Sequence, residues 1–433
     1  MQTNTGTVAP QQLEVSRPTA AMSIVTSLFF IWGFVTSLND VLIPHLQGVF
    51  SLNFFQSMFI QFAFFSAYCI FALPWGKVVD HIGYRNTMIA GLITAGIGCL
   101  LFVPAASLAS FPFFLAALVI LAGGITALQV AANPYVTILG PARTASSRLN
   151  LAQALNSLGT TIAPYLGGIL IFSAVKEGVA KSAPLTGAAL LASQQQQASS
   201  VKLPYVLLAI ILFALAAVIR LYRLPSLRSN NTTDIRPSDL RASGETIWNK
   251  PQVILATIAI FLYVGGEVSI GSFLVRYLHL PSIANFSELQ AAKYVSFYWG
   301  GAMVGRFIGS ALLRKFHTGT MVATFALIAG GLVLTSVLGH GYLSMWTILA
   351  VGLFNSIMFP SIFTIGIAGL GPLTSAASSL IVMAIVGGAI IPLAQGRLAD
   401  SIGIQHALFI PLICYAYIAF YGLWANKRIA VEI

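Results

Sequence analysis

Charge is what this sequence has least of. Only 8% of its 433 residues are charged, whereas 57% are hydrophobic, and the mean hydropathy is +0.87. A soluble domain carries about 25% charged residues, so this chain has too few charges to cover a water-facing surface. The composition therefore indicates that most of the chain lies in a lipid bilayer.

Cysteines and catalytic signatures are also scarce. The three cysteines, Cys69, Cys99 and Cys414, fall within apolar runs, where we expect them to act as small core residues rather than as disulfides or metal ligands. The sequence contains no HExxH, no GxSxG, no paired carboxylates and no phosphate-binding loop. We therefore predict that the chain is not an enzyme, binds no cofactor or metal, and does not use ATP.

The few charges that are present are mostly positive, with a formal net charge of +11. The Lys and Arg residues lie between apolar runs instead of forming a stripe, so we expect no nucleic-acid partner. Sixteen of the 22 fall on the side of the membrane that would hold both chain termini. By the positive-inside rule, both termini are then predicted to be cytoplasmic.

Long apolar runs dominate the rest of the sequence. Runs of about 20 residues are long enough to cross a bilayer as helices, and twelve are present. We predict an all-α membrane protein with twelve transmembrane helices at residues 22–47, 54–76, 86–107, 111–139, 148–173, 203–222, 251–278, 290–313, 319–339, 343–369, 374–397 and 404–425.

Polar segments divide the chain. Residues 1–21 form a polar tail without the features of a cleaved signal peptide, residues 174–202 are predicted to be a loop, and residues 223–250 form a basic hydrophilic linker. The linker separates a six-helix half at 22–222 from a second half, with a short cytoplasmic tail, at 251–433.

The two halves resemble each other in sequence. GKVVDHIGYRN (76–86) corresponds in position to GRFIGSALLRKF (305–316), and AANPYVTILGP (131–141) to SIMFPSIFTIGIAGLGP (356–372). Two pseudo-symmetric halves around a central site are typical of transporters. GRLADSIG (396–403) has the same spacing as GKVVDHIG, but it falls on the opposite side of the membrane, so we interpret that match as chance.

The first of these segments carries a known signature. Gly76, Asp80, Gly83 and Arg85 match the Gly-x-x-x-Asp-x-x-Gly-x-Arg loop of the major facilitator superfamily, with His81 standing where a basic residue is usual. The resemblance implies a major facilitator fold that works by alternating access. We expect a gating loop made of these four residues, with Gly305 and Arg306 in the second half; the alternative is a simple turn with solvated charges.

Four further segments narrow the resemblance. LNDVLIPHLQ (38–47), AANPYVTILGP (131–141), RLNLAQALNSLG (148–159) and GRFIGS (305–310) resemble the fucose–galactose–glucose:proton symporter family. LQVAANPYVTILGP and YVGGEVSIGSFL are most similar to its glucose/galactose branch. The fucose branch has Glu at the position of Gln129 and Gln at that of Glu267, so the acidic group has moved from the fourth helix to the seventh.

Two carboxylates, Asp40 and Glu267, lie deep inside apolar runs. A charge at mid-membrane costs several kcal/mol, so such residues are candidates for function. Because removal from water favours the protonated form of a carboxylate, both are candidates for binding and releasing the coupling proton. The resemblance implies this role for Asp40. For Glu267, carrying the proton, binding sugar hydroxyls, or both stay open, and a buried structural hydrogen bond or ion pair is the alternative for each carboxylate.

Neutral polar and aromatic residues in the same helices suit a sugar. Amides bind hydroxyls, and aromatic rings stack on the flat face of a sugar ring. Each amide is equally able to join two helices. The candidates are Asn39, Gln129, Asn133, Gln153, Asn156 and Asn355 for hydroxyls, and Trp32, Tyr263, Tyr298, Trp299 and Phe359 for stacking.

The expected function is proton-coupled symport of a hexose, with glucose or galactose first, across the bacterial inner membrane. L-fucose, N-acetylglucosamine, mannose or fructose as substrate, sodium coupling, and uncoupled transport stay open. A membrane sugar sensor is the alternative from another class, and the short loops count against it. We expect a monomer whose partners are the sugar and the bilayer.

Overall fold

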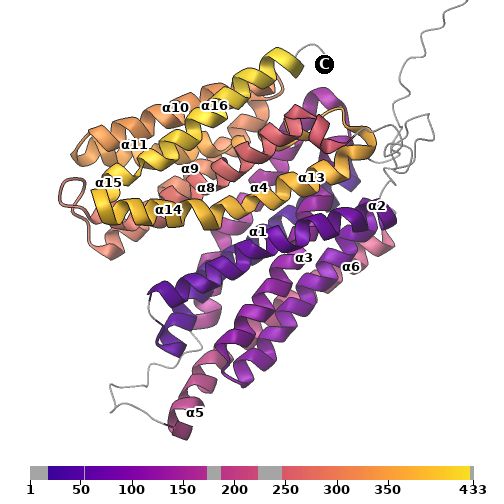
Figure 1. Ribbon diagram of the computed structural model, residues 1–433. Helices are drawn as coiled ribbons and strands as arrows, with labels where there is room; N and C mark the ends of the chain where they lie inside the picture. The colour runs from indigo at the N-terminus through magenta and orange to yellow at the C-terminus, as the bar shows by residue number, and fades with distance from the viewer. Residues whose placement is uncertain (1–17, 53, 173–186, 223–245, 430–433) are drawn as a thin grey trace, which may run out of the picture.

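The computed structural model describes residues 18–52, 54–172, 187–222 and 246–429, and every regular element in these ranges is helical. Figure 1 shows them as two groups, α1 to α6 and α8 to α16. The longer helices are α1 (Pro18–Phe50), α2 (Phe54–Ser107), α3 (Phe111–Ile138), α4 (Ala145–Phe172), α5 (Gly187–Ala198), α6 (Lys202–Leu221), α8 (Pro251–His279), α9 (Glu288–Leu312), α10 (Thr318–Leu338), α11 (Gly341–Asn355), α12 (Met358–Ile367), α13 (Thr374–Met383), α14 (Gly387–Ile402) and α16 (Phe409–Ile429). Short elements are η1 (Ala142–Thr144), η2 (Ser199–Val201), η3 (Ile247–Asn249), η4 (Gly371–Leu373), η5 (Ala384–Val386) and α15 (Ile404–Ala407).

Twelve membrane crossings account for these helices. Eight helical stretches of the described chain are long and apolar enough to cross a membrane. One of them, Phe59–Ser107, has 49 residues, about 74 Å of helix at 1.5 Å per residue, more than twice the hydrocarbon thickness of a bilayer. It breaks at Gly83 and so makes two crossings, and α1, α4 and α9 complete the twelve.

The sixth crossing begins earlier than the sequence indicated. Residues 187–198, predicted to belong to a loop, form helix α5, which runs through η2 directly into α6. The prediction of a loop over 174–202 was therefore wrong for its second part, while residues 173–186 lie outside the described chain. The run Gln194–Gln197 hid this helix, because a polar stretch beyond the apolar core of a bilayer does not prevent a helix from continuing.

Glycine ends a helix in the same way at two distant positions. Gly83 has φ 77° and ψ 167°, and Gly403 has φ 85° and ψ 158°, a region that side-chain-bearing residues avoid. The two glycines lie at opposite ends of the bundle. Gly76 accepts a hydrogen bond from Ser375 near the start of α13, whereas Gly403 follows α14 at the other end of the same crossing. The repeated Gly-x-x-x-Asp-x-x-Gly spacing thus accompanies the same local turn on both sides of the membrane.

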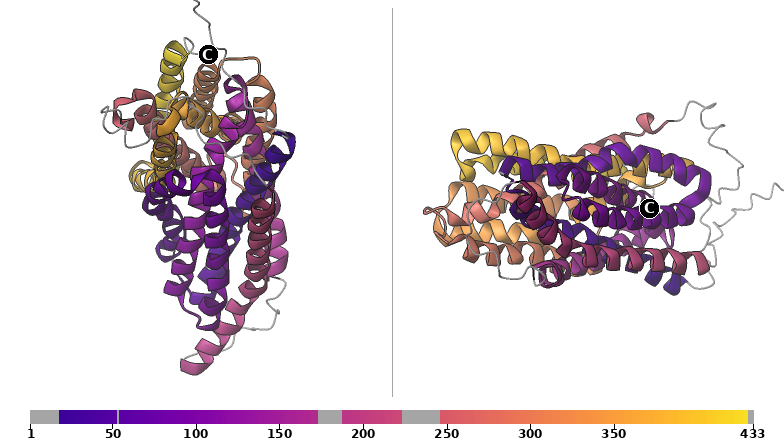
Figure 2. Two further views of the ribbon diagram at one scale, coloured as in Figure 1. Left: turned by 90° about the vertical axis from the view of Figure 1, so that its right-hand side faces the viewer. Right: turned by 90° about the horizontal axis from the view of Figure 1, so that it is seen from below.

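The N-terminal half (α1–α6) and the C-terminal half (α8–α16) meet at one end of the bundle. This closed end is where α1 begins, α6 ends, α8 begins and α16 ends; Figures 1 and 2 show the two groups of helices from three sides. Hydrogen bonds between the halves in the described chain lie mostly in the part of each helix nearest this end, and the Thr161–Met303 pair lies near the middle of α4 and α9. The pairs are Gly76–Ser375, Val130–Ser378, Ser146–Thr364, Ser146–Thr318, Ser147–Ser310, Ser147–Arg314, Asn150–Arg306, Ser157–Arg306, Gln153–Arg306 and Thr161–Met303.

Small residues set how closely the helices approach. A Cβ on Gly352 of α11 would collide with the carbonyl of Tyr298 on α9, and one on Gly387 of α14 would collide with the carbonyl of Phe261 on α8. Close backbone approach at small residues is the usual packing mode of membrane helices. At Gly352 it brings Tyr298 and Asn355 into one layer, where the candidate site lies.

Candidate functional site

Glu267 lies near the middle of α8 and is half-buried. Tyr263, one turn earlier on the same helix, has its hydroxyl 2.8 Å from Glu267 Oε1 and 3.1 Å from the backbone carbonyl of Asn355. Because 263 and 267 are four residues apart, their side chains share one face of the helix. The carboxylate is therefore held inside the bundle by an own-helix partner that is itself fixed against α11.

Asn355 joins four helices around this carboxylate. Its Nδ2 donates to the Tyr298 hydroxyl at 2.8 Å, and its Oδ1 accepts from the Tyr415 hydroxyl at 2.7 Å. The Tyr298 hydroxyl also donates to the backbone carbonyl of Glu267 at 3.2 Å. All three tyrosines and Asn355 are almost completely buried. We call Glu267, Tyr263, Asn355, Tyr298 and Tyr415 the carboxylate network.

A helix break beside Asn355 supplies the network with backbone hydrogen-bond acceptors. Helix α11 ends at Asn355 and α12 begins at Met358, so carbonyls near the break are free to accept side-chain donors. Tyr263 approaches the Asn355 carbonyl, and Arg306 Nε donates to the next carbonyl, that of Ser356, at 3.4 Å. Arg306 and Glu267 also interact electrostatically.

In the N-terminal half the candidate amides have different surroundings. Gln129 donates to the Tyr68 hydroxyl at 2.9 Å. Asn133, one turn further along α3, is fully buried, and neither of its side-chain polar atoms has a partner. Asn156 donates to the Phe29 carbonyl of α1 at 2.9 Å, which is a helix-joining role. Gln153 is buried on α4, and its backbone carbonyl lies 3.5 Å from Arg306 Nη1.

The aromatic candidates separate into buried and exposed groups. Trp32 is buried with its ring 4.7 Å from that of Phe29, and Phe359 stacks on Phe363 at 6.2 Å. Trp299 is 44% exposed and meets Tyr298 edge to face. Tyr263 and Tyr298 use their hydroxyls inside the carboxylate network, and stacking of their rings on a sugar stays a prediction.

Asn39 and Asp40 lie on α1, whose backbone spans both positions. Their side chains lie outside the described part of the structure, so their roles stay predictions.

The predicted gating residues belong mainly to helices. Gly76 and Asp80 lie within α2, and Gly305 and Arg306 lie within α9, in the helix predicted at residues 290–313, so these four residues are helical rather than part of a loop. Their role in gating stays a prediction. Gly83 forms the expected turn. Gly76 packs so tightly on α13 that a Cβ would collide with Ser379, and a Cβ on Gly305 would collide with the Leu353 carbonyl. Asp80 is exposed.

Arg85 has a local role in its own half. Its Nε and Nη2 donate to the carbonyls of Ile219 and Arg220 at 3.2 and 2.7 Å. It therefore caps the C-terminal carbonyls of α6, where positive charge is stabilising.

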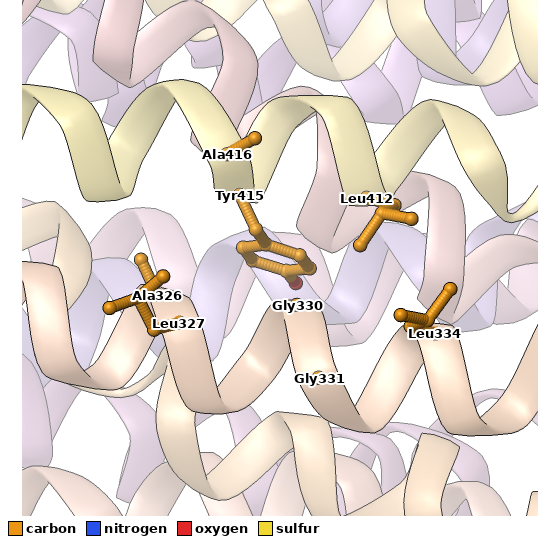
Figure 3. A pocket seen from close by; sticks show the side chains of 8 residues that line it. All are labelled: Ala326, Leu327, Gly330, Gly331, Leu334, Leu412, Tyr415 and Ala416. Carbon is orange, nitrogen blue, oxygen red and sulfur yellow. The ribbon is translucent and has the colours of Figure 1, made fainter.

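A groove of about 200 Å³ lies between α10 and α16, shown in Figure 3. Alanine and leucine side chains and the backbone at two glycines form its walls, and the Tyr415 ring lies between the two helices. This lining offers little to sugar hydroxyls, so the groove is not the candidate substrate site. In the described chain, no group of three or more His, Cys, Asp or Glu residues is placed to hold a metal ion.

Sequence reasoning missed Tyr415 and the serines of the closed end. Tyr415 is one of 14 tyrosines and lies in an apolar run without distinguishing neighbours. Ser147 and Ser310 exchange hydrogen bonds, with Ser147 Oγ donating to the Ser310 carbonyl at 2.7 Å and Ser310 Oγ to the Ser147 carbonyl at 3.0 Å. The repeat between the halves was the only available signal, and it does not specify such pairs.

Replacing Asn355 with alanine is expected to destabilise the protein by about 2–6 kcal/mol, because two buried tyrosine hydroxyls lose a partner at about 1–3 kcal/mol each. Thermal unfolding in detergent measures the loss. Asn426→Ala is the matched control, since Asn426 accepts from Thr320 near the surface at 3.0 Å and is expected to cost less than about 1 kcal/mol. An equal drop in the unfolding temperature for both variants would contradict the central role of Asn355.

These features define a twelve-crossing α-helical membrane protein of two six-helix halves, with a polar network at its centre. The chain belongs to the Major Facilitator Superfamily, whose family model matches residues 25–391. Its fold is similar to that of the transporter FucP in a crystal structure of the outward conformation, with a TM-score of 0.85 and 34% identity over 94% of this chain and 99% of that one.

Two curated relatives match almost the whole chain. The glucose/galactose transporter of Brucella abortus biovar 1 (strain 9-941) is 50% identical over 407 residues, which cover 94% of each protein. The L-fucose-proton symporter of Escherichia coli (strain K12) is 35% identical over 410 residues, covering 94% of this chain and 93% of the relative. The predicted resemblance to this family is thereby confirmed.

Proposed function

We propose that the protein carries a hexose, glucose or galactose first, together with a proton across the bacterial inner membrane by alternating access. The relatives named above support sugar as the substrate class and the proton as coupling ion. One observation carries the proposal for this chain. Glu267 is a carboxylate in mid-membrane, oriented by Tyr263 and surrounded by buried tyrosine and amide groups of four helices.

We assign the coupling proton to Glu267, with Asp40 as the second carboxylate. A carboxylate there is expensive unless it is neutralised or paired, and protonation provides neutralisation without a bound metal. Hydroxyls of the sugar would be bound by neutral amides and aromatic groups of both halves. The proposed set is Asn39, Gln129, Asn133, Gln153, Asn156, Asn355, Trp32, Tyr263, Tyr298, Trp299 and Phe359, with Gly76, Asp80, Gly83, Arg85, Gly305 and Arg306 controlling the closed end.

The topology follows from the charge distribution. We place both termini and the closed end in the cytoplasm, because that side carries sixteen of the 22 Lys and Arg residues. The proposed units are a tail at 1–21, a half at 22–222, a linker at 223–250 and a half with its tail at 251–433. A monomer suffices, since the two halves already enclose one site, and neither ATP nor nucleic acid has a role.

The test is uptake of radiolabelled hexoses into proteoliposomes with an inward proton gradient. Accumulation of glucose or galactose above the outside concentration, abolished by a protonophore, is expected. Preference for L-fucose, N-acetylglucosamine, mannose or fructose would change the substrate, and dependence on a sodium gradient would change the coupling ion. Equilibration without accumulation would indicate a facilitator, and binding without flux a sensor.

A further inference from the structure

The side chain of Arg306 contacts both halves of the protein. On its own half, Nε donates to the Ser356 carbonyl at the break between α11 and α12. Across the interface, Nη1 donates to Ser157 Oγ and lies 3.5 Å from the Gln153 carbonyl, both on α4. Asn150 Nδ2 donates to the backbone carbonyl of Arg306 at 2.6 Å. Both the side chain and the backbone of this residue therefore hold α9 against α4.

Arg306 also borders the carboxylate network. It binds the carbonyl of Ser356, while Tyr263, the partner of Glu267, approaches the carbonyl of the preceding residue. Among the described residues, the charged or titratable groups that face Glu267 are Tyr263 on its own helix, Tyr298 and Arg306 on α9, and Tyr415 on α16. Arg306 is the one cationic side chain in this set.

Opening of the closed end is expected to break the contacts of Arg306 with α4 and to leave its contact with the Ser356 carbonyl in place. Ser157 and Gln153 belong to the N-terminal half, whereas Ser356 and Glu267 belong to the C-terminal half. When α4 moves away from α9, the guanidinium loses its partners on α4 but keeps its position beside the network. The half-buried guanidinium then retains, of the hydrogen-bond partners named above, only the Ser356 carbonyl. Loss of partners by a partly desolvated charge is costly, and among the described residues of its own half an ionised Glu267 offers the compensating opposite charge.

We propose that Arg306 is a positioning residue that couples opening of the closed end to proton release from Glu267. While the closed end is sealed, Ser157 and Gln153 hold the guanidinium, and Glu267 keeps its proton. On opening, the O–H bond of the carboxyl group breaks, the proton passes to water entering from that side, and the carboxylate pairs with Arg306. The proposal rests on the proposed proton symport.

The test compares in proteoliposomes Arg306, which lies within α9, and Arg314, which lies in the turn just after α9. Arg314 Nε donates to Ser147 Oγ at 3.4 Å, so Arg306→Gln and Arg314→Gln each remove an arginine–serine bond between the C-terminal half and α4. Only Arg306 interacts with Glu267. Arg306→Gln is expected to retain sugar counterflow, which needs no net proton movement, and to lose gradient-driven accumulation by about tenfold, within the usual range of coupling between two ligand sites. Arg314→Gln is expected to keep the wild-type proton-to-sugar ratio.

The outcomes separate this inference from the proposed function. If the wild type does not accumulate sugar in a proton gradient, the proposed function fails. If the wild type accumulates and Arg306→Gln does so with the same proton-to-sugar ratio, or if both arginine variants lose coupling equally, the inference is overturned.

A second variant keeps the inference testable if Arg306→Gln does not fold. Ser157→Ala leaves Arg306 and Glu267 intact but removes the hydroxyl that holds the guanidinium in the sealed state. We expect this variant to leak protons and to transport fewer sugars per proton than the wild type. Rescue by Ser157→Thr, which restores a hydroxyl, is the expected companion result, and a normal ratio in Ser157→Ala would contradict the inference.

Discussion

Glu267→Gln is expected to abolish accumulation of sugar in a proton gradient while leaving sugar exchange intact. One proton crossing 100 mV gains about 2.3 kcal/mol, which corresponds to roughly 40-fold accumulation of a co-transported neutral sugar. Glutamine has the shape of glutamate and still accepts from the Tyr263 hydroxyl, now 2.8 Å from Oε1, but it binds no exchangeable proton. Uptake at a fixed membrane potential should therefore fall from about that ratio to unity.

Counterflow measured on the same preparation is the control for folding and sugar binding. Asp400→Asn is the matched variant, because Asp400 is an exposed carboxylate on α14, and it should accumulate sugar like the wild type. Asp40→Asn tests the other membrane carboxylate. If Asp40→Asn loses accumulation and Glu267→Gln keeps it, the proton belongs to α1 and Glu267 is a structural or sugar-binding acid.

Glu267 could be found from sequence because a carboxylate inside an apolar run stands out before any of its partners is known. Any carboxylate in the middle of an apolar run is unfavourable, so one residue suffices to mark it. The twelve crossings could be predicted for the same reason, because a run of about 20 apolar residues indicates a membrane helix whichever helices pack around it.

Features that depend on pairing were not predictable in this way. Asn355 was predicted to bind sugar, and that role is untested by its hydrogen bonds to Tyr298 and Tyr415. The sequence around Tyr415 contains no pattern that predicts the contact with Asn355. Serine–serine pairs between the halves join residues more than a hundred positions apart. Serine is too common in membrane helices for a single residue to indicate a partner.

Gly305 and Arg306 fall inside the helix predicted at residues 290–313, but the correspondence of GRFIGS with GKVVDHIG grouped them with the gating loop of the first half. In the structure, α9 continues to Leu312 and the chain turns only before Thr318. The helical position of Arg306 matters for the further inference, because it places the residue inside the bundle beside the carboxylate network rather than at the membrane surface.

Joining Ser147 and Ser310 by a disulfide is expected to stop transport. Their Oγ atoms are 3.2 Å apart across the two halves at the closed end, and two cysteines there would tie α4 to α9. Alternating access requires this end to open. In the Ser147→Cys/Ser310→Cys variant, oxidation should reduce uptake to less than about one tenth, and a reductant should restore it, because the locked protein retains its fold.

The background for this experiment is Cys69→Ser, since Cys69 is exposed while Cys99 and Cys414 are buried. Ser336→Cys/Ser344→Cys is the matched control, because Ser336 Oγ donates to the Ser344 carbonyl at 3.0 Å within the C-terminal half. A bond there crosses no moving interface and should leave uptake unchanged. If oxidation of the Ser147/Ser310 pair is shown by mass spectrometry and uptake persists, the closed end does not open during transport. The halves would then have to move about another interface. Arg306 could not couple opening of the closed end to proton release, so the further inference would fail as well.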